Sequence, residues 1–207
     1  MVEPLTPERR RALTRSHLLD AAARVFARQG FDGASIDDIA AAAGFTKGAV
    51  YSNFKNKEDL FLALMDRRTD EQIAAVQTTL DAATSLSSDE RAERFTALTA
   101  HLLWGDRDWQ LLYLEFALYA ARHPKARRLL AERQRQDRER LIPIIEAEFA
   151  RVPPRLRVPV DDLASIFLAL FGGIGLQHLT NPADADDTLL QSAIAFLEAA
   201  FAGDDEP

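Results

Sequence analysis

Apolar residues recur every three to four positions along nearly the whole chain, and the alternating pattern of a half-buried strand is almost absent. Over residues 8–29, for example, Leu18, Ala22, Val25 and Phe26 fall on one helical stripe. Similar stripes follow as far as residue 202, and glycines and prolines separate them. The sequence therefore predicts an all-α fold of about nine helices, without a sheet.

The composition excludes several classes of protein. The 207 residues include no cysteine, which excludes a disulfide framework, a thiolate zinc site, an iron–sulfur cluster and a cysteine nucleophile. The four histidines stand apart and no phosphate-binding glycine loop occurs, so we expect no metal, cofactor or catalytic residue. No signal sequence is evident and no window approaches about 18 uncharged apolar residues, so we expect a cytoplasmic protein without a membrane span.

Charge is unevenly distributed along the chain. The net charge of −7 excludes a surface that is positive throughout. Residues 1–57 nevertheless hold nine basic and six acidic side chains, and three of the four lysines, Lys47, Lys55 and Lys57, fall within eleven residues. This distribution is typical of a small module that approaches a polyanion, although a chance cluster on a solvated face would give the same balance.

Capping signals divide the N-terminal region into three helices and the start of a fourth. Ser35 is followed three residues later by Asp38, as in a capping box, and Gly44 ends that helix. Thr46 then begins a very short helix, expected over residues 47–53, and Asn56 caps the next helix, with Asp59 three residues later. Two helices joined by a tight glycine-containing turn form a helix-turn-helix, whose second helix enters the major groove of DNA. Four apolar residues are expected to hold the short helix in place: Ile39, Ala43, Val50 and Phe54.

The outward positions of the short helix carry small or hydrogen-bonding side chains. Lysine can donate to guanine, asparagine can pair with adenine, and alanine can contact the thymine methyl group. The predicted base contacts are Lys47, Gly48, Ala49, Ser52 and Asn53. The residues predicted to contact phosphates are the hydroxyl caps and their basic or aromatic neighbours, namely Ser35, Thr46, Tyr51, Lys55 and Lys57.

Residues 13–65 resemble the DNA-binding region of the TetR family of bacterial transcriptional regulators. Several motifs at fixed spacing carry the resemblance: Ala22-Ala23-Arg24-Val25-Phe26, Gly30-Phe31, Ser35-Ile36-Asp37-Asp38-Ile39-Ala40, Ala43-Gly44-Phe45-Thr46-Lys47-Gly48, Val50-Tyr51, Asn53-Phe54 and Lys55-Asn56-Lys57-Glu58-Asp59-Leu60. Asn53 stands where histidine is familiar in the family, which bears on operator choice. The resemblance implies a homodimer in which residues 1–57 bind a palindromic double-stranded DNA operator and residues 58–207 bind a small molecule and dimerise.

Two apolar stripes near the C-terminus are candidates for the dimer interface that the resemblance implies. Glycines at 172, 173 and 175 interrupt the first stripe, where they permit close packing of helices. An ordinary intramolecular core would show the same stripes. The residues predicted for this interface are Leu163, Ile166, Leu170, Gly173, Ile174, Leu189, Ala193, Ile194, Leu197 and Phe201.

A further group of residues is a candidate lining for a small-molecule pocket. Aromatic side chains at helical spacing chiefly fill cores, but so many around one bundle also suit an apolar cavity. The predicted lining is Leu98, Leu102, Trp109, Tyr113, Phe116, Phe167 and Phe171, with Tyr113 and His178 as polar partners. The expected effector is an apolar or aromatic small molecule.

Three segments receive other interpretations. The charged run at residues 127–140 is interpreted as a solvated face with pairs four residues apart, rather than a second nucleic-acid surface. Pro143 is expected to kink its helix. Residues 152–159, with three prolines, are interpreted as a linker and residues 203–207 as a frayed tail.

The favoured function is a ligand-responsive repressor. Its two recognition helices would enter successive major grooves about 34–36 Å apart. Ligand binding would favour a conformer in which the helix over residues 57–80 has swung and changed that separation. Two rivals stay open: a helical small-molecule-binding or enzymatic bundle with vestigial DNA-binding helices, and an activator or nucleoid-type structural DNA binder.

Overall fold

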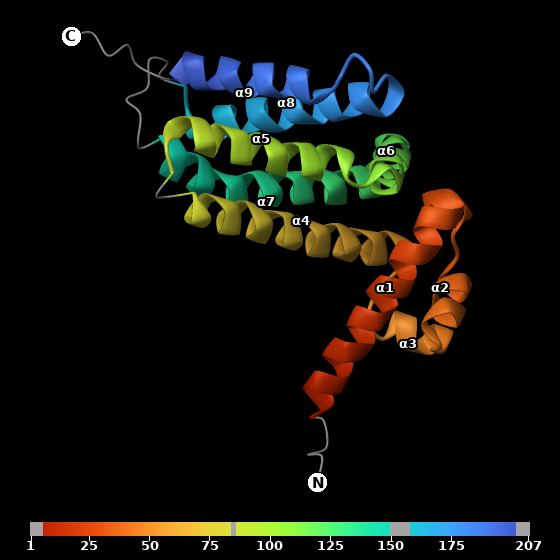
Figure 1. The fold of residues 1–207 in the computed structure, drawn as a ribbon. Coiled ribbons are helices and arrows are strands. Elements are labelled where there is room, and N and C mark those ends of the chain that lie inside the picture. The colour runs from red at the N-terminus through yellow and green to blue at the C-terminus, as the bar shows by residue number, and fades with distance from the viewer. Residues whose placement is uncertain (1–5, 84–85, 150–157, 202–207) are drawn as a thin grey trace, which may run out of the picture. The chain divides into compact units, whose positions relative to one another are not determined.

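The computed structural model describes residues 6–83, 86–149 and 158–201. Within these ranges it contains nine α-helices and no strand, which confirms the predicted fold class (Figure 1). The helices are α1 (Pro7–Gly33), α2 (Ile36–Ala43), α3 (Lys47–Tyr51), α4 (Lys57–Ala82), α5 (Ser88–Trp104), α6 (Arg107–Arg122), α7 (Pro124–Phe149), α8 (Val160–Thr180) and α9 (Asp187–Phe201). The proposed tail and most of the proposed linker lie outside the described residues.

The predicted caps of α2, α3 and α4 are confirmed. The Ser35 hydroxyl accepts a hydrogen bond from the Asp38 amide at 3.1 Å, and the Asp38 carboxylate accepts one from the Ser35 amide at 3.3 Å. The Thr46 hydroxyl accepts from the Ala49 amide at 3.2 Å. Asn56 likewise accepts from the Asp59 amide at 2.8 Å, which starts α4. These side chains satisfy amides that the first helical turn leaves without partners.

Two glycines adopt positive φ angles that set the path of the N-terminal helices. Gly44, with φ 71° and ψ 25°, ends α2 in the left-handed conformation, as predicted. Gly30, with φ 70° and ψ 175°, kinks α1 three residues before its end. The latter conformation is essentially restricted to glycine. The kink directs Phe31 into the core, where it is 1% exposed.

The described helices form two compact units. Among the described residues, the first comprises residues 6–68 and 108–133, and the second comprises residues 69–83, 86–107, 134–149 and 158–201, so α4 and α7 contribute to both. This division follows packing alone. The functional boundary expected after residue 57 stays a prediction.

An aromatic cluster lies at the centre of the first unit. The ring of Phe31 lies 5.3 Å from that of Phe61 and 4.8 Å from that of Phe116, and both pairs are edge to face. Phe61 and Phe116 stack at 4.3 Å. All three rings are essentially unexposed. Aromatic pairs of this kind contribute roughly 0.5–1.5 kcal/mol beyond the area that they bury. The cluster therefore joins α1 to α4 and α6.

The second unit has a core built from α5, α7, α8 and α9. Its buried residues are Ile145, Leu163, Ala164, Phe171, Leu190, Ile194 and Leu197. At one end, the ring of Trp104 stacks on His178 at 3.9 Å and its indole nitrogen donates to Asp187 at 2.8 Å. The backbone carbonyl of Ala185 lies 2.7 Å from Nδ1 of His178. These contacts tie the end of α5 to the turn between α8 and α9.

Helix α8 corrects one expectation. Among the described residues, it is the helix that is long and apolar enough to cross a membrane by length and composition, although no such stretch was expected. Residues 163–180 contain no aspartate, glutamate, lysine or arginine, although serine, glutamine, histidine and threonine lie among the apolar residues. Leu163, Ala164 and Phe171 of α8 are buried in the second core, as in a helix of a bundle.

Helix α7 corrects one further expectation. It continues through Pro143 as one helix, and a kink at that proline stays a prediction. Its charged run does include a pair four residues apart, Arg135 with Glu139 at 4.0 Å, but other arginines pair with neighbouring helices. Arg133 lies 2.9 Å from Asp66 of α4, and Arg138 lies 3.8 Å from Asp161 of α8. Arg140 pairs with Asp70. Periodicity within one helix could not indicate these partners, because they come from other helices.

Candidate nucleic-acid interface

The recognition helix α3 is only five residues long and depends on its neighbours. Val50 is unexposed, Phe54 is 2% exposed, and Ile39 of α2 is unexposed beneath them. Ala43 is partly buried against the same core. This arrangement confirms the contacts expected to hold α3 in place. A helix of this length would not be stable alone in water, so its orientation is set by α1 and α2.

The outer side of α3 carries most of the predicted base and phosphate contacts. Ala49 and Asn53 are half-buried, and the exposed residues are Thr46, Lys47, Gly48, Tyr51, Ser52 and Lys55. Tyr51 is 51% exposed, which is high for an aromatic side chain beside a packed helix. The structure therefore brings a set of small, hydroxyl and ammonium groups to one accessible surface.

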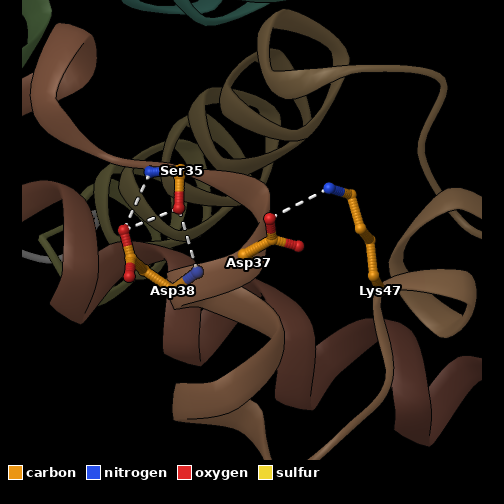
Figure 2. A network of polar contacts seen from close by, with 4 residues as sticks. All are labelled: Ser35, Asp37, Asp38 and Lys47. Carbon is orange, nitrogen blue, oxygen red and sulfur yellow. Dashed lines mark hydrogen bonds and ion pairs between the residues drawn. The ribbon is translucent and has the colours of Figure 1, made fainter.

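Lys47 is paired with α2 (Figure 2). Its ammonium nitrogen lies 2.9 Å from a carboxylate oxygen of Asp37, and both side chains are more than half exposed. The hydrogen bond to Asp37 raises the pKa of Lys47, so the lysine is fully charged at neutral pH. The same figure shows the Ser35 and Asp38 capping box on the adjoining turn of α2. Asp37 thus offsets part of the positive charge of the recognition surface.

Asn53 and Ser52 fold back onto the end of α3. The Asn53 amide nitrogen donates to the Ala49 carbonyl at 2.8 Å and to the Ser52 hydroxyl at 3.3 Å. Ser52 also donates to the Ala49 carbonyl, at 2.9 Å. The amide oxygen of Asn53 is buried without a hydrogen-bond partner among the described residues. A bidentate contact with adenine would require Asn53 to rotate away from these partners.

Lys57 has a structural role beside its predicted phosphate contact. Its ammonium group donates to the backbone carbonyls of Phe31 at 2.7 Å, Asp32 at 3.2 Å and Ala34 at 3.0 Å. An ammonium group has three donors, so these bonds use all of them. The nitrogen also lies 4.6 Å from the centre of the Phe31 ring. Lys57 therefore fastens the start of α4 to the connection between α1 and α2.

Helix α6 makes contacts with α1 and α4 that sequence reasoning missed. The Phe31 amide donates to the Glu115 carboxylate at 2.8 Å, and the Tyr119 hydroxyl donates to Glu58 at 2.9 Å. The Glu58 carboxylate raises the pKa of Tyr119. A side-chain to backbone bond that spans 84 residues leaves no pattern in a single sequence.

Two arginines of α1 also contact the end of α3. Arg11 donates to the Ser52 carbonyl and Arg15 to the Asn53 carbonyl, each at 3.2 Å. Their spacing of one helical turn is the only sequence signal that could have indicated a shared role.

The residues predicted to line a ligand pocket are divided between the two units. In the first unit, Phe116 is unexposed and Trp109 and Tyr113 are partly buried against the same core. In the second unit, Phe171 is 5% exposed and lies 4.2 Å from Phe167, while Leu98, Leu102 and His178 are half-buried. Their role in ligand binding stays a prediction.

The first unit has a groove of about 220 Å³ at the start of α4. It is lined by Asn56, Glu58, Tyr119, His123, Pro124, Lys125, Ala126 and Leu129, none of which was predicted to bind a ligand. The charges on Glu58 and Lys125 are opposite in sign, so the groove specifies no single class of ligand.

The predicted dimer residues have mixed exposure. Ile166 is 48% exposed and Gly173 is exposed, Leu170 and Leu189 are half-buried, and Leu163, Ile174, Ala193, Ile194 and Leu197 are buried within the unit. The side chain of Phe201 lies outside the described residues. On the described parts of α8 and α9, the large apolar side chains of Leu168, Leu176 and Phe196 are also exposed, and these were not predicted for the interface.

A capped helix, a glycine turn and a short, exposed second helix define this chain as a helix-turn-helix protein of the all-α class. A family model described as bacterial regulatory proteins, tetR family, matches residues 18–64, and one described as tetracyclin repressor-like, C-terminal domain, matches residues 87–203. The chain belongs to the TetR family, as the sequence resemblance implied.

Similar proteins fall into two groups. The HTH-type transcriptional regulator AcrR of Shigella flexneri is 54% identical over 48 residues, which cover 23% of this chain and 22% of AcrR. The HTH-type transcriptional repressor AcnR of Corynebacterium diphtheriae is 24% identical over 184 residues, which cover 89% of this chain and 90% of AcnR. The matches to the first three curated relatives span only 22–38% of their lengths.

A solved structure shares the complete fold. A candidate TetR-family regulator from Mesorhizobium loti has a TM-score of 0.72 and 19% identity, with 94% of this chain and 99% of that chain covered. At this identity the likeness shows the fold alone.

Proposed function

We propose that this chain is a DNA-binding transcriptional regulator that responds to a small molecule. One observation carries the proposal: α3 is anchored by buried Val50 and presents an exposed surface of hydrogen-bonding groups. Insertion into a major groove accounts for both properties. The family and the printed names of the relatives, which are regulators, favour this class over an enzyme.

The residues of α3 would have two kinds of role. Side chains on the outer surface, at Lys47, Gly48, Ala49, Ser52 and Asn53, would meet base edges. The surrounding groups would bind phosphates and fix the register, namely Ser35, Thr46, Tyr51, Lys55 and Lys57. Lys57 must release a carbonyl before it can bind a phosphate, so its contribution should be the smallest.

DNA binding can be tested with a duplex recovered by selection and a random duplex of equal length. Affinity should fall steeply with salt, because bound phosphates release counterions. Tyr51→Phe and Lys55→Ala should weaken binding to both duplexes similarly, whereas Lys47→Ala should change base preference. Absence of any salt-dependent binding by the full chain would refute the proposal and favour the small-molecule-binding bundle.

We infer that the working form is a homodimer formed by α8 and α9. Exposed Ile166, Leu168 and Leu176 on α8 and Phe196 on α9 support this, because a large apolar surface on one protomer marks an interaction site. A closed two-fold pair would cover both copies and present two recognition helices to a palindromic operator. A dimer interface would also account for the apolar surface of α8 without insertion into a membrane, in a protein that would bind DNA in the cytoplasm.

Sedimentation tests the dimer directly. Phe196→Glu should weaken self-association at least tenfold, because a charge would be buried without a partner. Leu118→Glu is a matched control on α6, where the leucine is 55% exposed outside the proposed interface. A monomeric wild type at micromolar concentration would refute the dimer.

The small molecule would act as an inducer that releases DNA from a repressor. It would enter the helices that follow residue 57 and favour a conformer in which α4 has moved. The ligand can weaken operator binding only by the ratio of its affinities for the two conformers. Equal affinity of the ligand for the free and the operator-bound protein would exclude this mechanism.

A further inference from the structure

Arg11 and Arg15 lie one turn apart on α1 and contact the C-terminal end of the recognition helix. Arg11 Nη2 donates to the carbonyl of Ser52, and Arg15 Nη1 donates to the carbonyl of Asn53, both at 3.2 Å. The guanidinium carbon of Arg15 also lies 4.4 Å from the centre of the Phe54 ring. The two guanidinium groups are thus fixed relative to α3 at its last turn.

Most of the hydrogen-bonding capacity of these arginines is unused. A guanidinium group has five N–H donors in a planar fork, and each arginine spends one on a carbonyl. Both residues are exposed, and neither makes an ion pair among the described residues. Each fork therefore keeps free donors beside Ser52 and Asn53, two of the five residues that are proposed to meet base edges.

We propose that Arg11 and Arg15 bridge the recognition helix to DNA, with one edge of each guanidinium on a carbonyl of α3 and the other on a backbone phosphate. A phosphate suits the free edge because its oxygens accept two parallel N–H bonds from the fork. The bridge couples the position of α3 to the phosphate backbone, so it sets the depth and register at which the base contacts form. This inference rests on the proposed DNA-binding function.

The bridge differs from the phosphate contacts predicted on α3 and α4. Those residues belong to the motif or follow it directly, whereas Arg11 and Arg15 lie on α1 before the motif, 41 and 38 residues from their acceptors at its end. Two further arginines, Arg9 and Arg10, are exposed on the same turn of α1 and add to the positive charge there.

The test measures affinity against salt for the full-length protein on a duplex of about 30 base pairs, enough for two half-sites roughly 10 base pairs apart. Each lost phosphate contact should lower the slope of log affinity against log salt by about 0.9. Arg11→Ala with Arg15→Ala should therefore flatten the slope by roughly 2 per protomer and weaken binding at least tenfold at 0.15 M salt.

Two further variants separate charge from anchoring. Arg11→Gln with Arg15→Gln keeps an N–H donor but removes the charge, so the slope should flatten as in the alanine variant. Arg11→Lys with Arg15→Lys keeps the charge but not the fork, so the slope should be retained while discrimination between selected and random duplexes falls. The control is Arg24→Ala with Arg28→Ala, which removes the same two charges from α1. These arginines lie about 20 Å along the helix from Arg11 and Arg15, a distance at which salt screens the interaction between charges.

The outcomes are distinct. An unchanged slope and affinity in the alanine variant, with salt-dependent binding by the wild type, would overturn the bridge and leave the proposed function intact. A lower affinity at an unchanged slope would also overturn it, because the arginines would then only stabilise α3. A wild type that does not bind DNA would overturn both the bridge and the function.

Discussion

The ammonium nitrogen of Lys47 lies 2.9 Å from a carboxylate oxygen of Asp37, so the first residue of the recognition helix is paired within the protein. Any DNA group that binds Lys47 must compete with this carboxylate. Phosphates compete with Asp37 for Lys47 at every position along the DNA, whereas guanine offers its two acceptors only where the DNA sequence contains a guanine. Asp37 should therefore reduce non-specific binding more than specific binding.

Asp37→Asn should raise affinity for a random duplex by roughly two- to fivefold at low salt, in the range expected for loss of an exposed ion pair. The gain should disappear at high salt, since screening removes the competition. Fluorescence anisotropy on random and selected duplexes measures both effects. Asp32→Asn is the matched control, because Asp32 is exposed and makes no ion pair within the described residues. Equal gains from the two variants would show that only net charge matters.

Lys57→Met should destabilise the protein by about 2–3 kcal/mol, because three backbone carbonyls lose a charged donor. Lys55→Met removes the same charge two residues away, where the side chain is exposed, and should change stability by less than about 0.5 kcal/mol. Urea unfolding followed by circular dichroism measures the difference. Equal stability of the two variants would contradict the structural role of Lys57.

Gly30→Ala should cost clearly more stability than Gly44→Ala, although the two glycines have nearly equal φ angles. A Cβ atom at Gly44 would meet nothing within 4 Å, so that variant bears only the left-handed strain of about 1–2 kcal/mol. At Gly30 the Cβ atom would lie 2.5 Å from a Glu115 oxygen. Movement of that carboxylate would break its bond to the Phe31 amide. Calorimetric melting of the two variants compares them, and similar melting temperatures would contradict the expected difference.

The Tyr119 hydroxyl and the Glu58 carboxylate should give a stability increment that is lost at alkaline pH. The raised pKa of Tyr119 means that folding favours its protonated form. The increment is therefore fully present below the ordinary tyrosine pKa near 10 and disappears as pH rises through the folded-state value. Tyr119→Phe should cost about 0.5–1.5 kcal/mol at pH 7 and less at pH 11. A cost that is constant with pH would contradict this linkage.

The features that could be predicted from the sequence, the helix caps and the buried apolar stripes, depend on residues that lie close together along the chain. The caps at Ser35, Thr46 and Asn56 act over three residues, so a short window contains both donor and acceptor. The apolar stripes likewise predicted that Val50 and Phe54 would be buried beneath α3. The contacts of Lys57 and Glu115 span 23 to 84 residues and end on backbone groups, which carry no sequence signature.

The exposure of residues on α8 shows a second limit of prediction from apolar periodicity. The stripe pattern assigned Leu163, Ile166 and Ile174 to one interface, but Leu163 and Ile174 are buried within their own unit while Ile166 is exposed. A helix that is apolar on nearly all sides does not reveal which side meets its own chain. The packing of α5 against α8 decides that question.

The aromatic cluster of Phe31, Phe61 and Phe116 has a practical consequence for engineered chimeras. A hybrid joined after residue 57 would keep Phe31 but take the other two rings, and the acceptor at Glu115, from a different protein. Transplanting operator preference between relatives therefore calls for a discontinuous graft that also carries the opening turns of α4 and the matching side of α6.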